Sequence, residues 1–227
     1  MKRGHAESGF LTAKEVEDAR QQLPEAVFRE LYLAEPSDEA GNPFGLTAIR
    51  DCIAPLSRLE PLVWGWDLAK SVDWIVGIGL DAHGSVARVE RFQRPWQETI
   101  TTIVKATGSA AALVDSTGVG DAVLEALQRR GEGALFEGFK FTAPAKQQLM
   151  EGLALAIQQR QIRFPEGFIV QELETFEYEY TRTGVRYAAP AGLHDDAVCA
   201  LALARRAWHQ FETRPSLAEG AKYPLFR

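Results

Sequence analysis

The spacing of hydrophobic positions changes near residue 62. Before that point, short amphipathic stretches are separated by turn-forming residues, and after it short apolar runs alternate with longer segments of helical periodicity. Short apolar runs predict buried strands, whereas apolar positions three or four residues apart predict helices. The pattern therefore predicts alternating strands and helices from residue 62 onward.

The expected strands cover residues 63–67, 74–80, 86–94, 111–115, 135–141, 175–181 and 185–189. The expected helices cover residues 96–107, 121–130, 144–160 and 196–211. Turn formers at 81–85 and at 182–184 predict hairpins between the strands that flank them. Two leading hairpin strands followed by alternation predict an α/β fold, a mixed β-sheet with helices on both faces.

The first part of the chain, residues 1–60, has a different pattern. Its expected elements are helices at 12–23, 24–33 and 47–53 and a loop at 35–43. Thr12 and Glu15 have the spacing of a capping box, which starts the first helix. This segment has too few apolar residues to fold alone, so we expect it to pack on a neighbour.

Composition is that of a folded chain with one good core: 46% of the 227 residues are hydrophobic and 25% are charged. We expect a helical connector at 1–60, the main domain at 61–212 and an irregular tail at 213–227. No apolar run reaches the roughly 18 residues of a membrane span, and no secretory leader is evident, which predicts an intracellular protein without a membrane partner. Cys52 and Cys199 lack metal-binding or redox spacing, so we expect no disulfide.

Three acidic positions, far apart in sequence, each stand where an apolar run meets a polar turn. Asp67 and Asp115 end expected strands, and the pair Asp195 and Asp196 opens an expected helix. Carboxylates beside apolar residues cost free energy unless something compensates them. Strand ends of such a sheet also share one edge, where ligands gather. The pattern predicts a shared Mg²⁺ or Mn²⁺ site, because these hard cations prefer oxygen ligands.

The helix start leaves the third ligand open. Carboxylates at this position also bind the free amides of a helix N-terminus, so one aspartate is expected to cap and the other to bind metal. His194, just before them, is a candidate for binding metal or orienting water, and a simple hydrogen-bonded histidine is the alternative. Further auxiliary candidates are Asp73, Asp121, Lys70 and Lys146, each with an ordinary structural role as its alternative.

The net charge of −6 argues against indiscriminate DNA coating, since DNA affinity rests mainly on neutralised phosphates. Any DNA contact must come from local basic patches. Basic residues gather at Arg88, Arg91 and Arg94, at Arg129 and Arg130, at Arg160 and Arg163, and at Arg182 and Arg186. We interpret most of them as solvated faces and retain the hairpin arginines, Arg182 and Arg186, as candidate DNA contacts.

Three segments, taken together in this order and spacing, carry a family resemblance. They are Gly65-Trp66-Asp67-Leu68-Ala69-Lys70-Ser71, Val114-Asp115-Ser116-Thr117-Gly118-Val119-Gly120-Asp121 and Gly192-Leu193-His194-Asp195-Asp196-Ala197. Over residues 61–210 the chain resembles the nuclease domain of the large terminase subunit of tailed bacteriophages, whose fold is ribonuclease H-like. The resemblance implies a divalent-metal-dependent DNA endonuclease that cuts concatemeric viral DNA during genome packaging in the host cell cytoplasm.

The resemblance also implies roles for the acidic residues. Asp67 would bridge two cations and Asp115 would hold one of them, in a two-metal phosphodiester hydrolysis. For the third ligand it favours Asp196 over Asp195, because related terminases often carry a small residue at the latter position.

In this family the nuclease follows an ATPase motor, and residues 1–60 look like the end of that motor and its connector. The sequence holds no Gly-x-x-x-x-Gly-Lys-Ser/Thr segment, so no nucleotide cofactor is expected. The implied partners are double-stranded DNA, the portal protein, the terminase small subunit and the motor itself.

Three alternatives stay open. A resolvase, a transposase or another ribonuclease H-like nuclease would use the same carboxylates. An actin-like nucleotide-binding domain would be stabilised by ATP rather than by Mn²⁺. A non-catalytic docking module would cleave nothing with any metal.

Overall fold

The computed structural model describes residues 12–22, 28, 32, 41–68, 74–118, 120–131, 133–181 and 184–212. Predictions at Lys70, Asp73, Arg182 and 213–227, and almost all of the expected helix at 24–33, lie outside the described residues.

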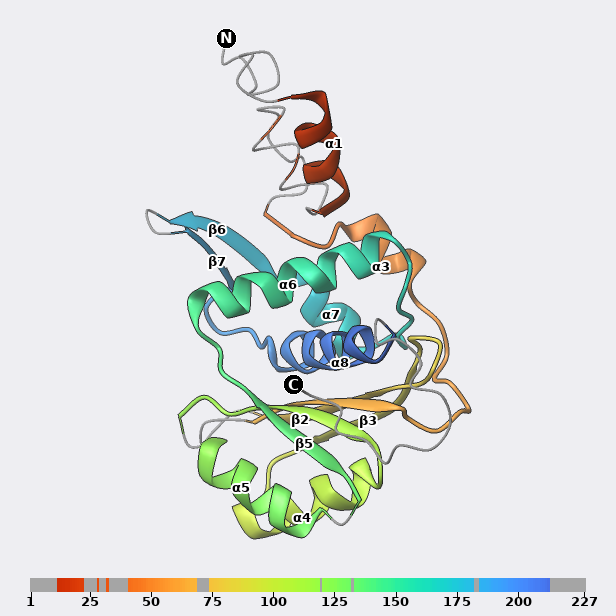
Figure 1. Ribbon diagram of the computed structural model, residues 1–227, viewed down its shortest axis with the longest axis vertical. Coiled ribbons are helices and arrows are strands. Elements are labelled where there is room, and N and C mark those ends of the chain that lie inside the picture. The colour runs from red at the N-terminus through yellow and green to blue at the C-terminus, as the bar shows by residue number, and fades with distance from the viewer. Residues whose placement is uncertain are drawn as a thin grey trace.

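Five strands form the central sheet, in the order β3-β2-β1-β4-β5 (Figure 1). They are β1 (Val63–Asp67), β2 (Ile75–Leu80), β3 (Val86–Phe92), β4 (Ala111–Asp115) and β5 (Leu135–Phe139). The first three pair antiparallel, whereas β1 with β4 and β4 with β5 pair parallel. This confirms the predicted mixed sheet. Two further strands, β6 (Glu177–Thr181) and β7 (Gly184–Ala188), form a separate hairpin.

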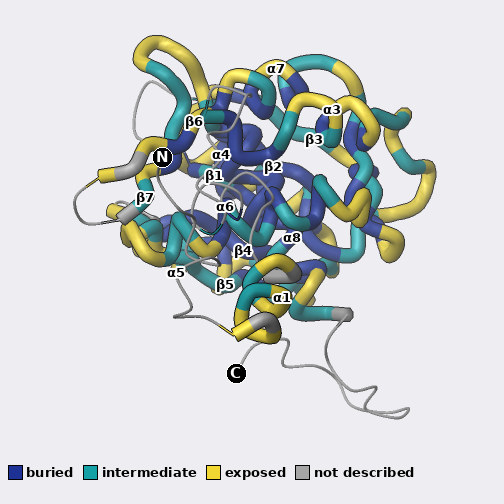
Figure 2. Tube along the Cα trace, turned by 90° about the horizontal axis from the view of Figure 1, so that it is seen from above, coloured by how far each residue is buried: buried dark blue, intermediate teal, exposed yellow. Residues whose placement is uncertain are grey.

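Helices cover both faces of the sheet (Figure 1). One face carries α8 (Asp196–Glu212), with α6 (Ala143–Gln158), α7 (Phe168–Thr175) and α3 (Leu46–Asp51) beyond or beside it, and the other carries α4 (Trp96–Thr107) and α5 (Gly120–Arg130). We call them the α8 face and the α4 face. Each strand side contributes to a separate apolar core. In Figure 2 the buried residues run along the central strands and α8, and the exposed ones lie at the periphery.

Strand β1 shows how alternation divides its side chains between the two faces. Trp64 and Trp66 stack on each other, with ring centroids 5.1 Å apart, in the core under α4. Val63 belongs to the core under α8, and Gly65 follows on that side. A Cβ at Gly65 would overlap backbone atoms of Ala200 and Ala204, so only glycine permits this close approach of α8. The next residue on the α8 face is Asp67.

Residues 41–60 pack on the domain, as expected of a segment that cannot fold alone. Phe44, Ile49 and Cys52 are fully buried in the core that also holds α6, α7 and α8. Asn42 fastens the segment, because its side-chain amide donates to the carbonyl of Leu173 at 2.8 Å. The predicted domain boundary between residues 60 and 61 stays a prediction. Phe44, Ile49 and Cys52, which precede it, share the core of the main domain.

Helix α7 was not predicted, since the expected strand at 175–181 was preceded by an unassigned segment. Ile169, Val170 and Leu173 are buried at helical spacing, but this helix is only eight residues long and has two β-branched residues in its first turn, which obscures its period. In the N-terminal segment, α1 (Ala13–Gln22) begins at the predicted capping box. The backbone amide of Thr12 donates to Glu15 Oε2 at 2.7 Å, and the amide of Glu15 donates to Thr12 Oγ1 at 3.2 Å.

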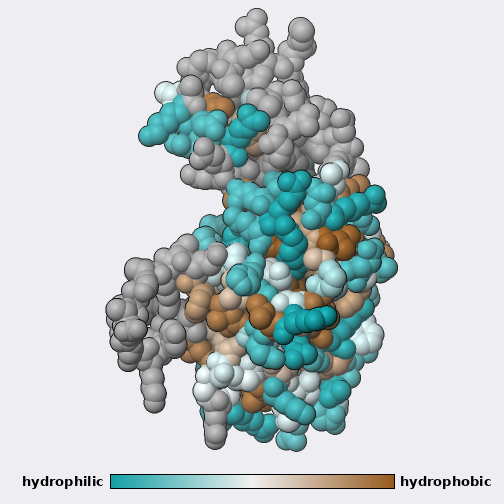
Figure 3. All heavy atoms as spheres, turned by 90° about the vertical axis from the view of Figure 1, so that its right-hand side faces the viewer, coloured by the Kyte–Doolittle hydropathy of each residue, from teal (hydrophilic) through white to brown (hydrophobic). Residues whose placement is uncertain are grey.

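On the face shown in Figure 3, hydrophilic side chains surround small hydrophobic areas. Across the residues that the structure describes, we find no helix with the length and apolar character needed to span a membrane. Both cysteines are free thiols, and both are buried.

Candidate metal centre

Two of the predicted acidic residues lie side by side because their strands are parallel neighbours. In the register of β1 and β4, Trp66 is opposite Val114, so Asp67 and Asp115 follow at the same carboxyl edge of the sheet. Both point to the α8 face, since Gly65 and Leu113 precede them by two positions. Asp115 is buried, and its Oδ1 accepts from the amide of Thr117 at 2.8 Å, which fixes the loop after β4.

Helix α8 brings the second pair of aspartates to this edge. Because α8 packs against Gly65 through Ala200, its first turn, one turn earlier, lies over the end of β1. Asp196 is only 8% exposed there. His194 Nδ1 lies 3.4 Å from Asp196 Oδ2, on a side chain that is about half exposed. The fold therefore gathers carboxylates that are separated by about 130 positions in sequence.

The gathered charges oppose one another. Burial raises the pKa of Asp67 well above its usual value, and the carboxylates of Asp115, Asp196 and Asp195 raise it further, while Lys146 lowers it. Such a cluster takes up either a proton or a cation. The donors are all carboxylate oxygens, which fit Mg²⁺ or Mn²⁺. Within the described ranges, however, no three His, Cys, Asp or Glu side chains already stand in a metal-holding arrangement.

Among the residues that the structure describes, Lys146 is the cation that acts on this cluster, since it lowers the pKa of Asp67. It stands in the first turn of α6, where Thr142 caps the helix by accepting from the amide of Ala145. Lys146 Nζ donates to Asp195 Oδ2 at 3.0 Å, and both side chains are about three-quarters buried. Burial alone would lower the pKa of Lys146, but the carboxylates of Asp195 and Asp67 raise it. Lys146 therefore stays charged and is committed to Asp195.

Glu172, which the sequence analysis did not single out, completes the acidic edge. It is buried on α7, and its Oε2 accepts from the backbone amide of Ala197 at 2.7 Å. We expected Asp195 or Asp196 to cap this helix. For the amide of Ala197, Glu172 supplies the cap instead. Burial raises the pKa of Glu172, and Asp196 adds to the effect. The local sequence signal is an acidic residue next to the apolar positions 168–170 and 173.

The remaining candidates lie at the periphery. Asp121 Oδ2 accepts from Lys140 Nζ at 3.1 Å, with both side chains exposed. Arg186 is exposed on β7 and, with Lys146, lines a cavity of about 640 Å³ between the start of α6 and the β6–β7 hairpin. Buried in α8 beside the cluster, Cys199 has a pKa that burial raises well above the usual thiol value, so it stays neutral.

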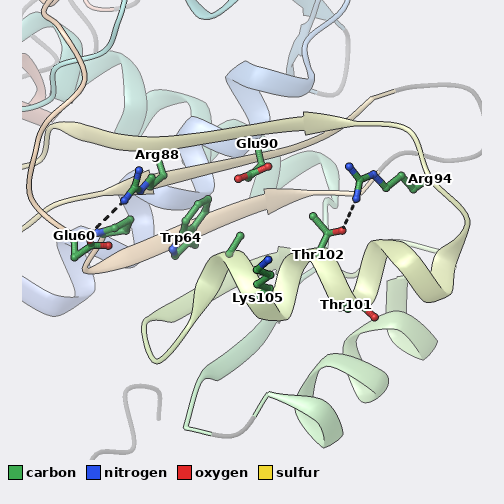
Figure 4. Close-up of a pocket in the computed structure, with 10 residues that line it drawn as sticks. Glu60, Trp64, Arg88, Glu90, Arg94, Thr101, Thr102 and Lys105 are labelled. Carbon is green, nitrogen blue, oxygen red and sulfur yellow. Dashed lines mark hydrogen bonds and ion pairs between the residues drawn. The ribbon is translucent and has the colours of Figure 1, made fainter.

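A second cavity of about 640 Å³ lies on the α4 face, between β3 and α4 (Figure 4). Its charged side chains are mainly exposed. Arg88 Nη2 pairs with Glu60 Oε1 at 3.4 Å, and Arg94 Nη1 donates to Thr102 Oγ1 at 3.1 Å. The sheet separates this cavity from the aspartate cluster, so its residues take no part in the candidate metal centre.

A mixed five-stranded sheet, with carboxylates at the ends of two parallel strands and at the start of a facing helix, defines an α/β domain built around an acidic centre. Residues 64–205, more than half of the chain, match the family described as the terminase RNaseH-like domain. The chain belongs to this family, which also confirms the predicted ribonuclease H-like fold.

Similar proteins agree with this assignment. The large terminase subunit of Thermus phage G20c is 32% identical over 168 residues, which cover 71% of this chain and 33% of that protein. The chain thus spans about a third of the length of this curated relative.

Solved structures of the G20c large terminase nuclease also match. One has 27% identity and a TM-score of 0.64, covering 73% of this chain and 98% of that one. Another, with bound magnesium, has 28% identity and a TM-score of 0.64, covering 75% and 98%.

Proposed function

We propose that this chain is the nuclease part of a phage large terminase and cuts double-stranded concatemeric viral DNA during genome packaging. The observation that carries the proposal is the cluster at Asp67, where burial and the neighbouring carboxylates raise the pKa of Asp67 well above its usual value, in a chain of this family. The magnesium bound in a structure of the similar G20c nuclease supports a divalent cation in this chain, and we place it at the Asp67 cluster.

We assign the metal-holding roles to Asp67, Asp115 and Asp196. When bound, Mg²⁺ or Mn²⁺ would activate water and stabilise the leaving oxygen of a phosphodiester, as a pair of ions does in two-metal sites. Asp195 is the weaker candidate for the third ligand, because its Oδ2 is committed to Lys146. Lys146 acts as a positioning residue, since its salt bridge holds α6 against the first turn of α8.

For the DNA, the cavity beside Lys146 and Arg186 is the surface we assign next to the cluster. Arg182, in the same hairpin, is a candidate for further phosphate contact. His194 and Asp121 are auxiliary candidates at the edge of the centre, and so are Lys70 and Asp73.

The proposal for the whole machine follows the family. Residues 1–60 would connect the domain to an ATPase motor, and that motor, the small subunit and the portal protein would assemble with it in the host cytoplasm. This chain would then cleave DNA without hydrolysing ATP.

Plasmid cleavage by the purified chain tests the proposal. We expect nicking and linearisation with Mn²⁺ or Mg²⁺ and none with EDTA, and we expect Asp67→Asn to abolish both while the domain stays folded. Asp51→Asn is the matched control. Asp51 is the last residue of α3 and pairs with Arg160, away from the cluster. Cleavage by Asp67→Asn at the wild-type rate would exclude the assigned centre. A strong preference for branched over linear DNA would instead favour a resolvase.

A further inference from the structure

Arg91 occupies an unusual position for an arginine. Its guanidinium packs against two aromatic rings, with Cζ 4.7 Å from the ring centroid of Trp74 and 4.7 Å from that of Phe168. Trp74 precedes β2, and Phe168 begins α7, so rings from two separate parts of the chain pack on this side chain. Stacking on aromatic faces restricts a guanidinium without using its N–H donors.

The hydrogen-bond donors of Arg91 are available. Its Nε is buried and has no hydrogen-bond partner, and within the described residues no carboxylate lies within 4.0 Å of the guanidinium. The charge of Arg91 acts on Glu172. It lowers the pKa of Glu172, although burial has the larger, opposite effect. The carboxylate of Glu172, however, accepts from Ala197. A partly buried cation without a direct partner is costly, which favours an anionic ligand.

The register of the sheet sets Arg91 in line with the candidate metal centre. Asp67 on β1 is opposite Val76 on β2, and Val76 is opposite Arg91 on β3. Residues paired in this way share one face of the sheet, and Phe168 of α7 confirms that this is the α8 face. Two strand spacings separate Arg91 from Asp67, or roughly 10 Å between their Cα atoms. A DNA strand positioned at Asp67 would therefore bring a neighbouring phosphate within reach of the long Arg91 side chain.

We propose that Arg91, clamped by Trp74 and Phe168, binds a backbone phosphate of the DNA beside the one to be cleaved. This inference rests on the proposed function and adds a substrate contact to it. An arginine fork matches phosphate geometry and needs no reorganisation when two rings already hold it. The rival explanation is that Arg91 only fastens α7 to the sheet, in which case its charge would not affect DNA affinity.

Binding of a short DNA duplex, measured by fluorescence anisotropy in EDTA across a range of salt concentrations, separates the two explanations. Arg91→Met keeps an apolar stem against the rings and removes the charge. We expect it to bind roughly tenfold more weakly, the effect of losing one charged contact. The slope of log affinity against log salt should become shallower by about 0.9 for the lost phosphate contact.

Arg88→Met is the matched control, because Arg88 lies on the same strand but on the α4 face, paired with Glu60. It should bind DNA as the wild type does. Equal losses in both variants, or an Arg91→Met variant with wild-type affinity and salt slope, would overturn the proposal. If Arg91→Met does not fold, Arg91→Gln supports the same comparison with a planar neutral end. EDTA keeps this test separate from metal-dependent cleavage, which the Asp67→Asn experiment addresses.

Discussion

Both faces of the sheet carry charged groups, but only on the α8 face do these groups converge in a buried cluster. On the α8 face, the carboxyl groups of Asp67, Asp115 and Asp196 are gathered at one edge, where burial and then the charges of Asp115 and Asp196 raise the pKa of Asp67 well above its usual value. On the α4 face, Arg88 and Glu60 form a pair that is largely exposed. The comparison shows that burial and convergence, rather than the number of charges, distinguish a candidate centre from a solvated groove.

The largest expected effect comes from two glycines in paired strands, Gly65 facing α8 and Gly79 facing the opposite side of the sheet. A Cβ at Gly65 would overlap the backbone of α8, whereas a Cβ at Gly79 would meet side chains of Pro61 and Trp64 at 2.9–3.0 Å. Backbone cannot yield as side chains can, so Gly65→Ala should destabilise by more than about 3 kcal/mol and displace α8. Gly79→Ala should cost about 1–3 kcal/mol, as overpacking does. Urea unfolding of both variants measures the difference, and a Gly65→Ala variant as stable as Gly79→Ala would contradict the close packing of α8.

The next effect sharpens the role of Glu172. Glu172→Ala leaves the buried amide of Ala197 without its acceptor, which should cost about 1–3 kcal/mol. Glu172→Gln keeps an acceptor oxygen and should recover most of that loss. Glu174→Ala on the same helix removes only an exposed pair with Arg50, so it should change stability by less than about 0.5 kcal/mol. Thermal unfolding with and without Mn²⁺ also tests whether the cap supports metal binding, since Glu172→Ala should then show a smaller Mn²⁺-induced stabilisation than Glu172→Gln.

A third prediction concerns pH. Because the folded-state pKa of Asp67 lies above its unfolded value, the native state binds its proton more tightly. The metal-free protein should therefore lose stability as pH rises from the unfolded value of 3.8 through the folded pKa. Burial also raises the pKa of Glu172, so this residue likewise makes the protein less stable as the pH rises.

Asp67→Asn should flatten this dependence and, at neutral pH without metal, raise the melting temperature by about 2–4 °C for each kcal/mol of repulsion removed. Mn²⁺ should stabilise the wild type more than the variant. A metal-free wild type whose stability climbs between mildly acidic and neutral pH, with Asp67→Asn showing the same climb, would mean that the carboxylates do not repel one another as described.

The sequence predicted the elements that carry the acids better than it predicted the contacts around them. Strands β1 and β4 have the expected bounds, because an uninterrupted apolar run stops at a charged residue in each. The α/β pattern also predicted that the ends of these two strands share one edge of the sheet, and the parallel pairing of β1 with β4 places them there. Helix α7 was missed, and with it Glu172, whose importance depends on which helix packs beside α8. Arg91 was read as one of several solvated arginines, since nothing local in sequence indicates that Trp74 and Phe168 pack on it.

The smallest expected effect lies on the α4 face and tests the comparison from its other side. Arg88 and Glu60 are 60% and 83% exposed at a separation of 3.4 Å, so solvent screens their attraction. Exposed pairs of this kind contribute little, and Arg88→Ala should change stability by less than about 0.5 kcal/mol. Cleavage of plasmid DNA should also continue at the wild-type rate, because the sheet lies between Arg88 and Asp67. A loss of cleavage in Arg88→Ala at unchanged stability would show that DNA reaches the α4 face, and the division between a functional and a solvated face would no longer hold.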